Sequence, residues 1–166
     1  MLSSLLLLAA STLVGQADVP QAALDAMEYR VGKWKSTGYI DGETEGQPGH
    51  ETTEWIPGRH AIRVTGMHFE QGVKKLAGGI IGWDAEKEQL VEHWYVSDGS
   101  YATFCYYLGK EKDAWIGTFR WVNADGSVVK GPSRVDRKSH NEWEWNATFK
   151  DNGEQRRWRA VSHRLQ

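Results

Sequence analysis

The sequence predicts an all-β protein: an up-and-down antiparallel β-barrel of about ten strands preceded by one N-terminal helix. Three observations lead to this prediction. Runs rich in β-branched and aromatic residues follow one another along most of the chain, short turns such as Asp98-Gly99 and Asp125-Gly126 separate them, and only one segment has helical periodicity. Asp-Gly pairs between such runs are strong hairpin signals. The 166 residues are the length of one domain.

The single helix is expected over residues 21–31. Leu24, Met27 and Val31 recur there at the spacing of one helix face. Gly32 follows directly, at a position where helices commonly end.

After Gly32 every segment has the character of a strand, and no second helix is expected. The expected strands are 33–40, 50–56, 60–70, 73–83, 89–97, 101–108, 114–122, 127–138, 142–149 and 154–163. The strand at 127–138 contains Gly131-Pro132, where an interruption is expected. Regular spacing of this kind predicts a meander, and closing the meander into a barrel removes its exposed edges.

The first 17 residues differ from the rest. They contain no charged side chain, and the apolar run from Leu5 to Val14 is shorter than the roughly 20 residues of a membrane-spanning helix. Gly15 and Ala17 offer small residues for signal cleavage. We therefore expect residues 1–17 to be a signal peptide and 18–166 the barrel domain, exported to the periplasm or the extracellular space, with no stable insertion in a membrane.

Charge and cysteine content narrow the classes of partner. A formal net charge of -2 and a pI near 6.3 favour neither a nucleic acid nor an anionic membrane. Cys105 is the only cysteine, so no internal disulfide can form. Its aromatic surroundings in the sequence indicate an inert thiol.

Two motifs carry a resemblance to a known group. Gly32-Lys33-Trp34 links the helix to the first strand, and the stretches 79–84 (GIIGWD) and 93–99 (HWYVSDG) follow later. Together they resemble the calycin superfamily, which includes lipocalins, fatty-acid-binding proteins and a bacterial lipocalin-like family of unknown function.

This resemblance implies how one end of the barrel is closed. In calycins the Trp of the Gly-x-Trp motif lies at one barrel end, and a basic residue of a late strand stacks on it. The implied barrel seal is Gly32 with Trp34, and the basic partner is expected among Arg157, Arg159 and Arg164, the first two preferred. A guanidinium over an indole ring gains cation–π attraction.

Aromatic residues predict a ligand pocket. The chain has nine Trp, and period-two alternation places one aromatic set on one face of 114–122 and another on one face of 142–149. These rings either fill the core or line an apolar pocket. The candidate ligand-binding residues are Trp115, Phe119, Trp121, Trp143, Trp145, Arg63, His93 and Tyr95.

A metal site and a haem site are the alternatives to this pocket. His60, His68 and His93 lie on candidate strands, where their side chains either converge on a metal ion or remain separate. We expect them to remain separate and therefore expect no metal site. Nitrobindin-type barrels, which the layout resembles more distantly, use a His near the C-terminus as the iron ligand, and His163 occupies such a position.

The leading expectation is therefore an exported protein that binds a small apolar or amphipathic molecule in its barrel, without a cofactor. The alternatives are a haem-binding barrel using His163 and a cyclase- or isomerase-type enzyme. For the enzyme, Glu92, Arg63 and Tyr95 have side chains suited to acid–base chemistry, but no catalytic motif is present.

Overall fold

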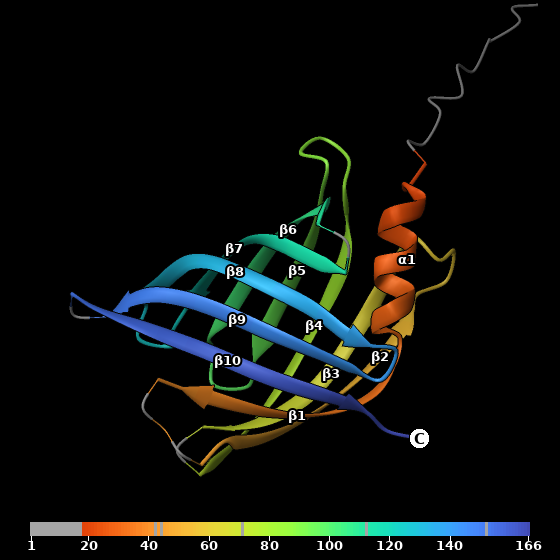
Figure 1. Cartoon of the computed structure of the whole chain (residues 1–166). Helices are drawn as coiled ribbons and strands as arrows, with labels where there is room; N and C mark the ends of the chain where they lie inside the picture. The colour runs from red at the N-terminus through yellow and green to blue at the C-terminus, as the bar shows by residue number, and fades with distance from the viewer. Residues whose placement is uncertain (1–17, 42, 44, 71, 112, 152) are drawn as a thin grey trace, which may run out of the picture.

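A computed structural model describes residues 18–166 except 42, 44, 71, 112 and 152 (Figure 1). The expected signal peptide, 1–17, lies outside the described residues. The elements, in order, are α1 (Gln21–Arg30), β1 (Gly32–Ile40), β2 (Gln47–Trp55), β3 (Ala61–Glu70), β4 (Val73–Asp84), β5 (Gln89–Val96), β6 (Tyr101–Glu111), β7 (Ala114–Val122), β8 (Val128–Ser139), β9 (Glu142–Asp151) and β10 (Glu154–Arg164).

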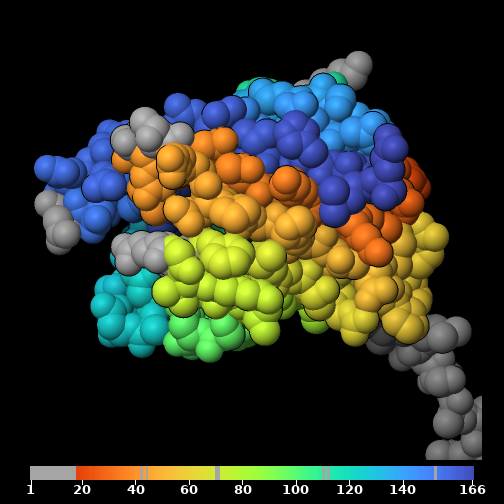
Figure 2. Space-filling model, turned by 90° about the horizontal axis from the view of Figure 1, so that it is seen from below, coloured from red at the N-terminus to blue at the C-terminus, as the bar shows by residue number. Residues whose placement is uncertain are grey.

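The ten strands close into one antiparallel barrel. Each strand pairs with its sequence neighbours, and β10 returns to β1 with Trp34 opposite Arg164. Figure 2 shows this closure: the orange β1–β2 segment lies between blue β10 and the yellow-green β3–β4 segment. The predicted fold class is thereby confirmed.

The expected interruption in the eighth strand is wrong. β8 runs continuously through Gly131 and Pro132, and Pro132 lies opposite Thr118 of β7. A proline removes only its own N–H, so pairing continues on both sides of it. The irregularity in this strand lies further on, between Arg137 and Ser139 in the pairing with β9.

Alternation decides which side chains enter the barrel interior, which we call the lumen. On β1, Trp34 points inward and is fully buried, while Lys33 and Lys35 are exposed. On β10, Ser162 points inward beside exposed His163. The same parity continues around the closed sheet through the register of the paired strands.

Helix α1 covers one end of the barrel (Figure 1). Its buried residues Met27 and Tyr29 pack in one cluster with Trp34, Trp115 and Trp143. The Tyr29 hydroxyl donates to the backbone carbonyls of Ser139 and Glu142, at 2.9 and 2.8 Å, where β8 turns into β9. We call this closed end the floor. No helix among the described residues is long and apolar enough to cross a membrane.

Candidate functional site

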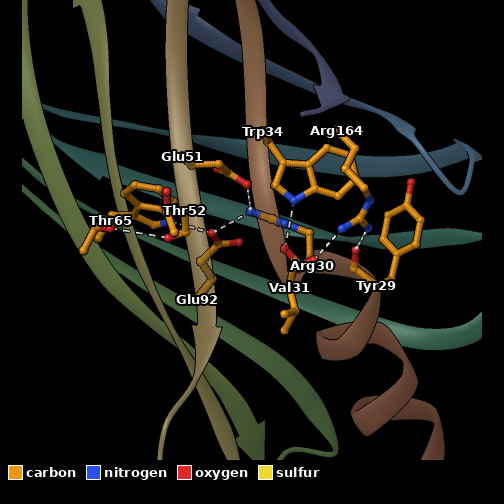
Figure 3. A network of polar contacts seen from close by, with 10 residues as sticks. Tyr29, Arg30, Val31, Trp34, Glu51, Thr52, Thr65, Glu92 and Arg164 are labelled. Carbon is orange, nitrogen blue, oxygen red and sulfur yellow. Dashed lines mark hydrogen bonds and ion pairs between the residues drawn. The ribbon is translucent and has the colours of Figure 1, made fainter. Parts of the chain in front are cut away.

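Trp34 is the centre of the floor. Its side chain is fully buried, and its Nε1 donates to the backbone oxygen of Arg30 at 2.9 Å. The guanidinium carbon of Arg164 lies 4.2 Å from the indole centroid. Arg164 also donates to the backbone oxygens of Tyr29 and Val31 (Figure 3). One arginine therefore ties the last strand to the end of α1 and covers the indole ring.

Gly32 is required by the same contact. Its φ of 133° belongs to a region that other residues rarely adopt, and a Cβ at this position would lie 2.5 Å from Nη1 of Arg164. Any side chain at position 32 would displace the guanidinium that covers Trp34.

The preferred basic partners, Arg157 and Arg159, lie elsewhere. Arg157 donates to Asn146 at 2.6 Å, and Arg159 donates to both oxygens of Glu144 at 3.0 and 3.1 Å. Both are exposed on the outer surface. Odd-numbered positions of β10 face outward, whereas Arg164 lies directly opposite inward-facing Trp34. The role implied for Arg157 and Arg159 therefore belongs to Arg164.

A charged group lies inside the barrel, just above the floor. Arg30, only 3% exposed, places Nη2 at 3.1 Å from Oε1 of Glu51 and 3.5 Å from Oε1 of Glu92. Figure 3 shows its guanidinium between the two carboxylates. Its guanidinium carbon is also 4.6 Å from the Trp143 ring centroid. We call Arg30, Glu51 and Glu92 the floor cluster; α1, β2 and β5 contribute one residue each.

Burial controls the electrostatics of this cluster. Burial raises the pKa of Glu51, the Arg30 guanidinium opposes that rise, and the Glu92 carboxylate adds to it. Burial alone would lower the pKa of Arg30, but the two carboxylates outweigh it and hold that pKa above its usual range. The pKa of Tyr106 on β6 is also raised, mainly by burial and to a smaller extent by the Glu92 carboxylate. In water-poor surroundings these groups stay charged only when they are paired.

Aromatic side chains of β6 to β10 line the lumen beyond the floor cluster. Trp145 donates from Nε1 to the Tyr106 hydroxyl at 3.0 Å and meets Phe104 and Phe119 edge-on, at centroid distances of 5.8 and 6.0 Å. Trp158 continues the contacts toward the other end of the barrel. We call this set the aromatic wall: Phe104, Phe119, Trp121, Trp145, Phe149 and Trp158.

Four members of the aromatic wall are incompletely covered. Phe104, Trp121, Trp145 and Trp158 are only half-buried although they point into a closed barrel. Small residues occupy inward positions of the strands across the lumen: Ser36, Gly38, Gly49, Gly66, Ala77 and Gly79. The rings therefore face a side of the lumen with few bulky side chains. We call the end of the barrel opposite the floor the mouth.

The predicted aromatic ligand residues all point inward but divide into two groups. Trp115 and Trp143 are buried in the floor beside Tyr29 and Trp34. Phe119, Trp121 and Trp145 belong to the aromatic wall. The first group is packed beneath α1, whereas Trp121 and Trp145 of the second group are only half-buried.

The predicted polar ligand residues lie outside the lumen. Arg63 is exposed and pairs with Glu54, His93 contacts Thr103 at 3.2 Å on the outer face, and Tyr95 is 68% exposed. On β5 the inward positions are the even-numbered ones, so the face shared by His93 and Tyr95 is the outer one. The prediction that these three side chains line the pocket is wrong. Of the three residues named for the enzyme alternative, Glu92 faces inward, whereas Arg63 and Tyr95 face outward.

The histidines considered as metal or haem ligands do not share one site. His60 is exposed between β2 and β3, His68 sits at an inward position of β3, and His93 faces outward, so the three do not converge. The described residues contain no group of three or more metal-binding side chains. His163 is 62% exposed on the outer face, 3.9 Å from Glu142. Its side chain therefore does not face the lumen.

Sequence reasoning missed Arg30 and Glu51 and weighed Glu92 only as an acid–base group. A signal was present for Arg30, which lies three and seven residues after Met27 and Ala23 on the buried helix face. A charged residue at an apolar position of this kind indicates a buried ion pair. Glu51 occupies an inward position between Gly49 and Thr53, but its partners on α1 and β5 cannot be found from one strand.

A groove of about 550 Å³ lies outside the barrel, between α1 and the turn from β2 to β3. Glu28 in this groove already accepts hydrogen bonds from Trp55 and Arg59, both at 2.7 Å. The guanidinium of Arg59 also lies 4.8 Å from the Trp55 ring centroid. Because these polar groups satisfy one another, the groove is a weaker candidate site than the lumen.

Comparison with one solved structure supports the fold, and two further structures show weaker similarity. Rv2717c from M. tuberculosis superposes with a TM-score of 0.60 and 15% identity, over 90% of this chain and 100% of Rv2717c. A redesigned β-barrel, b11L5F_LGL, has a TM-score of 0.49 and 10% identity, over 85% of this chain and 96% of that one. EF1p2_mFAP2b bound to DFHBI has a TM-score of 0.49 and 10% identity, over 87% and 99%.

The similarity to Rv2717c shows a shared fold and nothing about activity. No family model and no curated protein matches the chain.

Proposed function

We propose that the lumen binds one small apolar or amphipathic molecule against the aromatic wall. The observation that carries this proposal is the incomplete burial of rings that point into a closed barrel, Trp121, Trp145 and Trp158 among them. Apolar rings left partly uncovered inside a protein are covered favourably by an apolar ligand, with a gain of about 25 cal/mol per Å² buried.

The route of entry follows from the floor. Trp34, Arg164 and α1 close that end, so the ligand enters through the mouth, where β1, β3, β5, β7 and β9 end. Polar groups of the floor cluster lie at the far end of this path. A ligand that is apolar along its length and polar at its tip matches this arrangement.

A fluorescent probe whose emission rises in apolar surroundings tests the proposal. We expect saturable binding at one site of the native protein, and Trp121→Ala or Trp145→Ala should weaken it by about tenfold, as loss of a central aromatic contact does. Trp55→Ala is the matched control, because Trp55 lies beside the outer groove. Urea melts of all three variants separate lost binding from lost folding. Probe binding only to partly unfolded protein would refute the proposal.

We also propose that the chain is an exported lipocalin-like protein. The Gly32-Lys33-Trp34 motif and the Arg164 contact on Trp34 support the family. The uncharged, apolar N-terminal residues support export. Mass spectrometry of small molecules released from freshly purified protein identifies the natural ligand, whether or not the protein is exported.

A further inference from the structure

The floor cluster holds more negative than positive charge. Arg30 is the only cation among its three members, and its guanidinium faces two carboxylates. Other nearby arginines are engaged elsewhere: Arg164 on Trp34 and on backbone oxygens, and Arg137 over the Tyr29 ring at 4.2 Å. The ionised cluster therefore carries one uncompensated negative charge inside the barrel, which is costly without a partner.

Glu51 is the less covered of the two carboxylates. The Glu51 side chain is 11% exposed, whereas Thr53, the next inward residue of β2 toward the floor, is 2% exposed. Because the floor side is covered, the exposed part of Glu51 borders the lumen. Within the described residues, the Thr53 hydroxyl is buried without a hydrogen-bond partner, and its oxygen can accept from a donor such as an ammonium group. Unsatisfied buried polar atoms of this kind are expected where a ligand or water completes a site.

The rings around the cluster suit a cation. Trp94 donates from its indole to Glu92, and its ring packs against the floor residues together with Phe104 and Trp145. Aromatic faces attract positive charge, and a carboxylate beside them strengthens that attraction. An anionic group at the same place would meet Glu51 and Glu92.

We propose that the floor cluster is a subsite for a protonated amine carried on an apolar body. This inference rests on the proposed function and names its ligand class: an apolar or aromatic amine whose body lies along the aromatic wall. The ammonium group would pair with Glu51 and bring the cluster to electrical neutrality.

The proposal predicts competition between the amine and a proton. Burial and Glu92 raise the pKa of Glu51, so Glu51 takes up a proton more readily than an ordinary glutamate, and that proton would relieve the excess charge. The charged groups that act on the pKa of Glu51 are Arg30 of α1 and Glu92 of β5, and the titratable residue His68 occupies an inward position on the neighbouring strand β3. When an ammonium group pairs with Glu51, the proton on Glu51 is released to solvent. The affinity for the amine therefore increases as pH rises through the pKa of Glu51.

Three probes of one chain length test the ligand class: decylamine, decanol and decanoate, each below its micelle concentration, followed by tryptophan fluorescence. We expect decylamine to bind at least about tenfold more tightly than decanol, and decanoate most weakly, as one added charge contact predicts. Calorimetry in two buffers of different ionisation heat should show proton release with decylamine only.

Variants on one strand supply the matched control. Glu51→Gln should abolish the preference for the amine and the proton release. Glu54→Gln, the same substitution on the outer face of β2, should keep both. Equal binding of amine and alcohol to the wild-type protein, or an unchanged preference in Glu51→Gln, would overturn this inference and leave the apolar pocket standing. Absence of binding by all three probes would instead defeat the proposed function. The wild-type comparison decides the question even if Glu51→Gln does not fold.

Discussion

Replacing Trp34 with Ala tests the floor most directly. The indole is fully buried and lies 5.9 Å from the Tyr29 ring and 6.2 Å from the Trp143 ring. Deleting a buried aromatic side chain costs about 3–5 kcal/mol through lost burial and the cavity that remains. We expect the free energy of unfolding of Trp34→Ala to fall by this amount.

Two specific contacts place the loss toward the upper end of that range. The Arg30 backbone oxygen loses its Nε1 donor, which costs about 1–3 kcal/mol if no water replaces it. The Arg164 guanidinium loses the ring beneath it, a contact worth about 0.5–2 kcal/mol. Trp34→Phe keeps a ring but removes the donor, so it should cost less than Trp34→Ala.

Urea unfolding followed by far-UV circular dichroism measures these differences without relying on tryptophan emission. Trp121→Ala is the control, since Trp121 is half-buried near the mouth and its loss should destabilise the protein less. A loss below about 1 kcal/mol for Trp34→Ala, within the range of ordinary surface changes, would refute the seal.

Three further predictions concern Gly32, Glu51 and the N-terminal residues. Gly32→Ala should lower the free energy of unfolding by about 1–3 kcal/mol, because position 32 has positive φ and adjoins Arg164; a neutral effect in urea melts would contradict this. Burial raises the pKa of Glu51 above its ordinary 4.5, so the stability that its proton contributes is full below that value and is lost as pH rises through the folded pKa. As pH rises above 4.5, Glu51→Gln should therefore lose less stability than wild type, whereas Glu54→Gln should follow wild type in the same melts. Residues 1–17 should be absent from secreted protein, and an intact mass that includes Met1 would exclude cleavage there.

The candidate site was only partly predictable from the sequence. Alternation identified Phe119, Trp121 and Trp145 as one-sided aromatic positions, and the structure places them in the aromatic wall. Alternation alone does not say which side of a strand is the inside. His93 and Tyr95 were assigned to the correct common face, but that face is the outer one.

The sequence by itself determined the strand order, the single helix and the barrel class, because turn chemistry and period-two alternation are local properties of the chain. Only the tertiary structure decided that Arg164, and not Arg159, covers Trp34, since that choice depends on the register of β10 against β1. The tertiary structure likewise brought Arg30 and Glu51 together with Glu92. Those residues are distant in the chain, and the force that pairs them, the cost of leaving a charge unpaired inside the barrel, arises only once the barrel has closed.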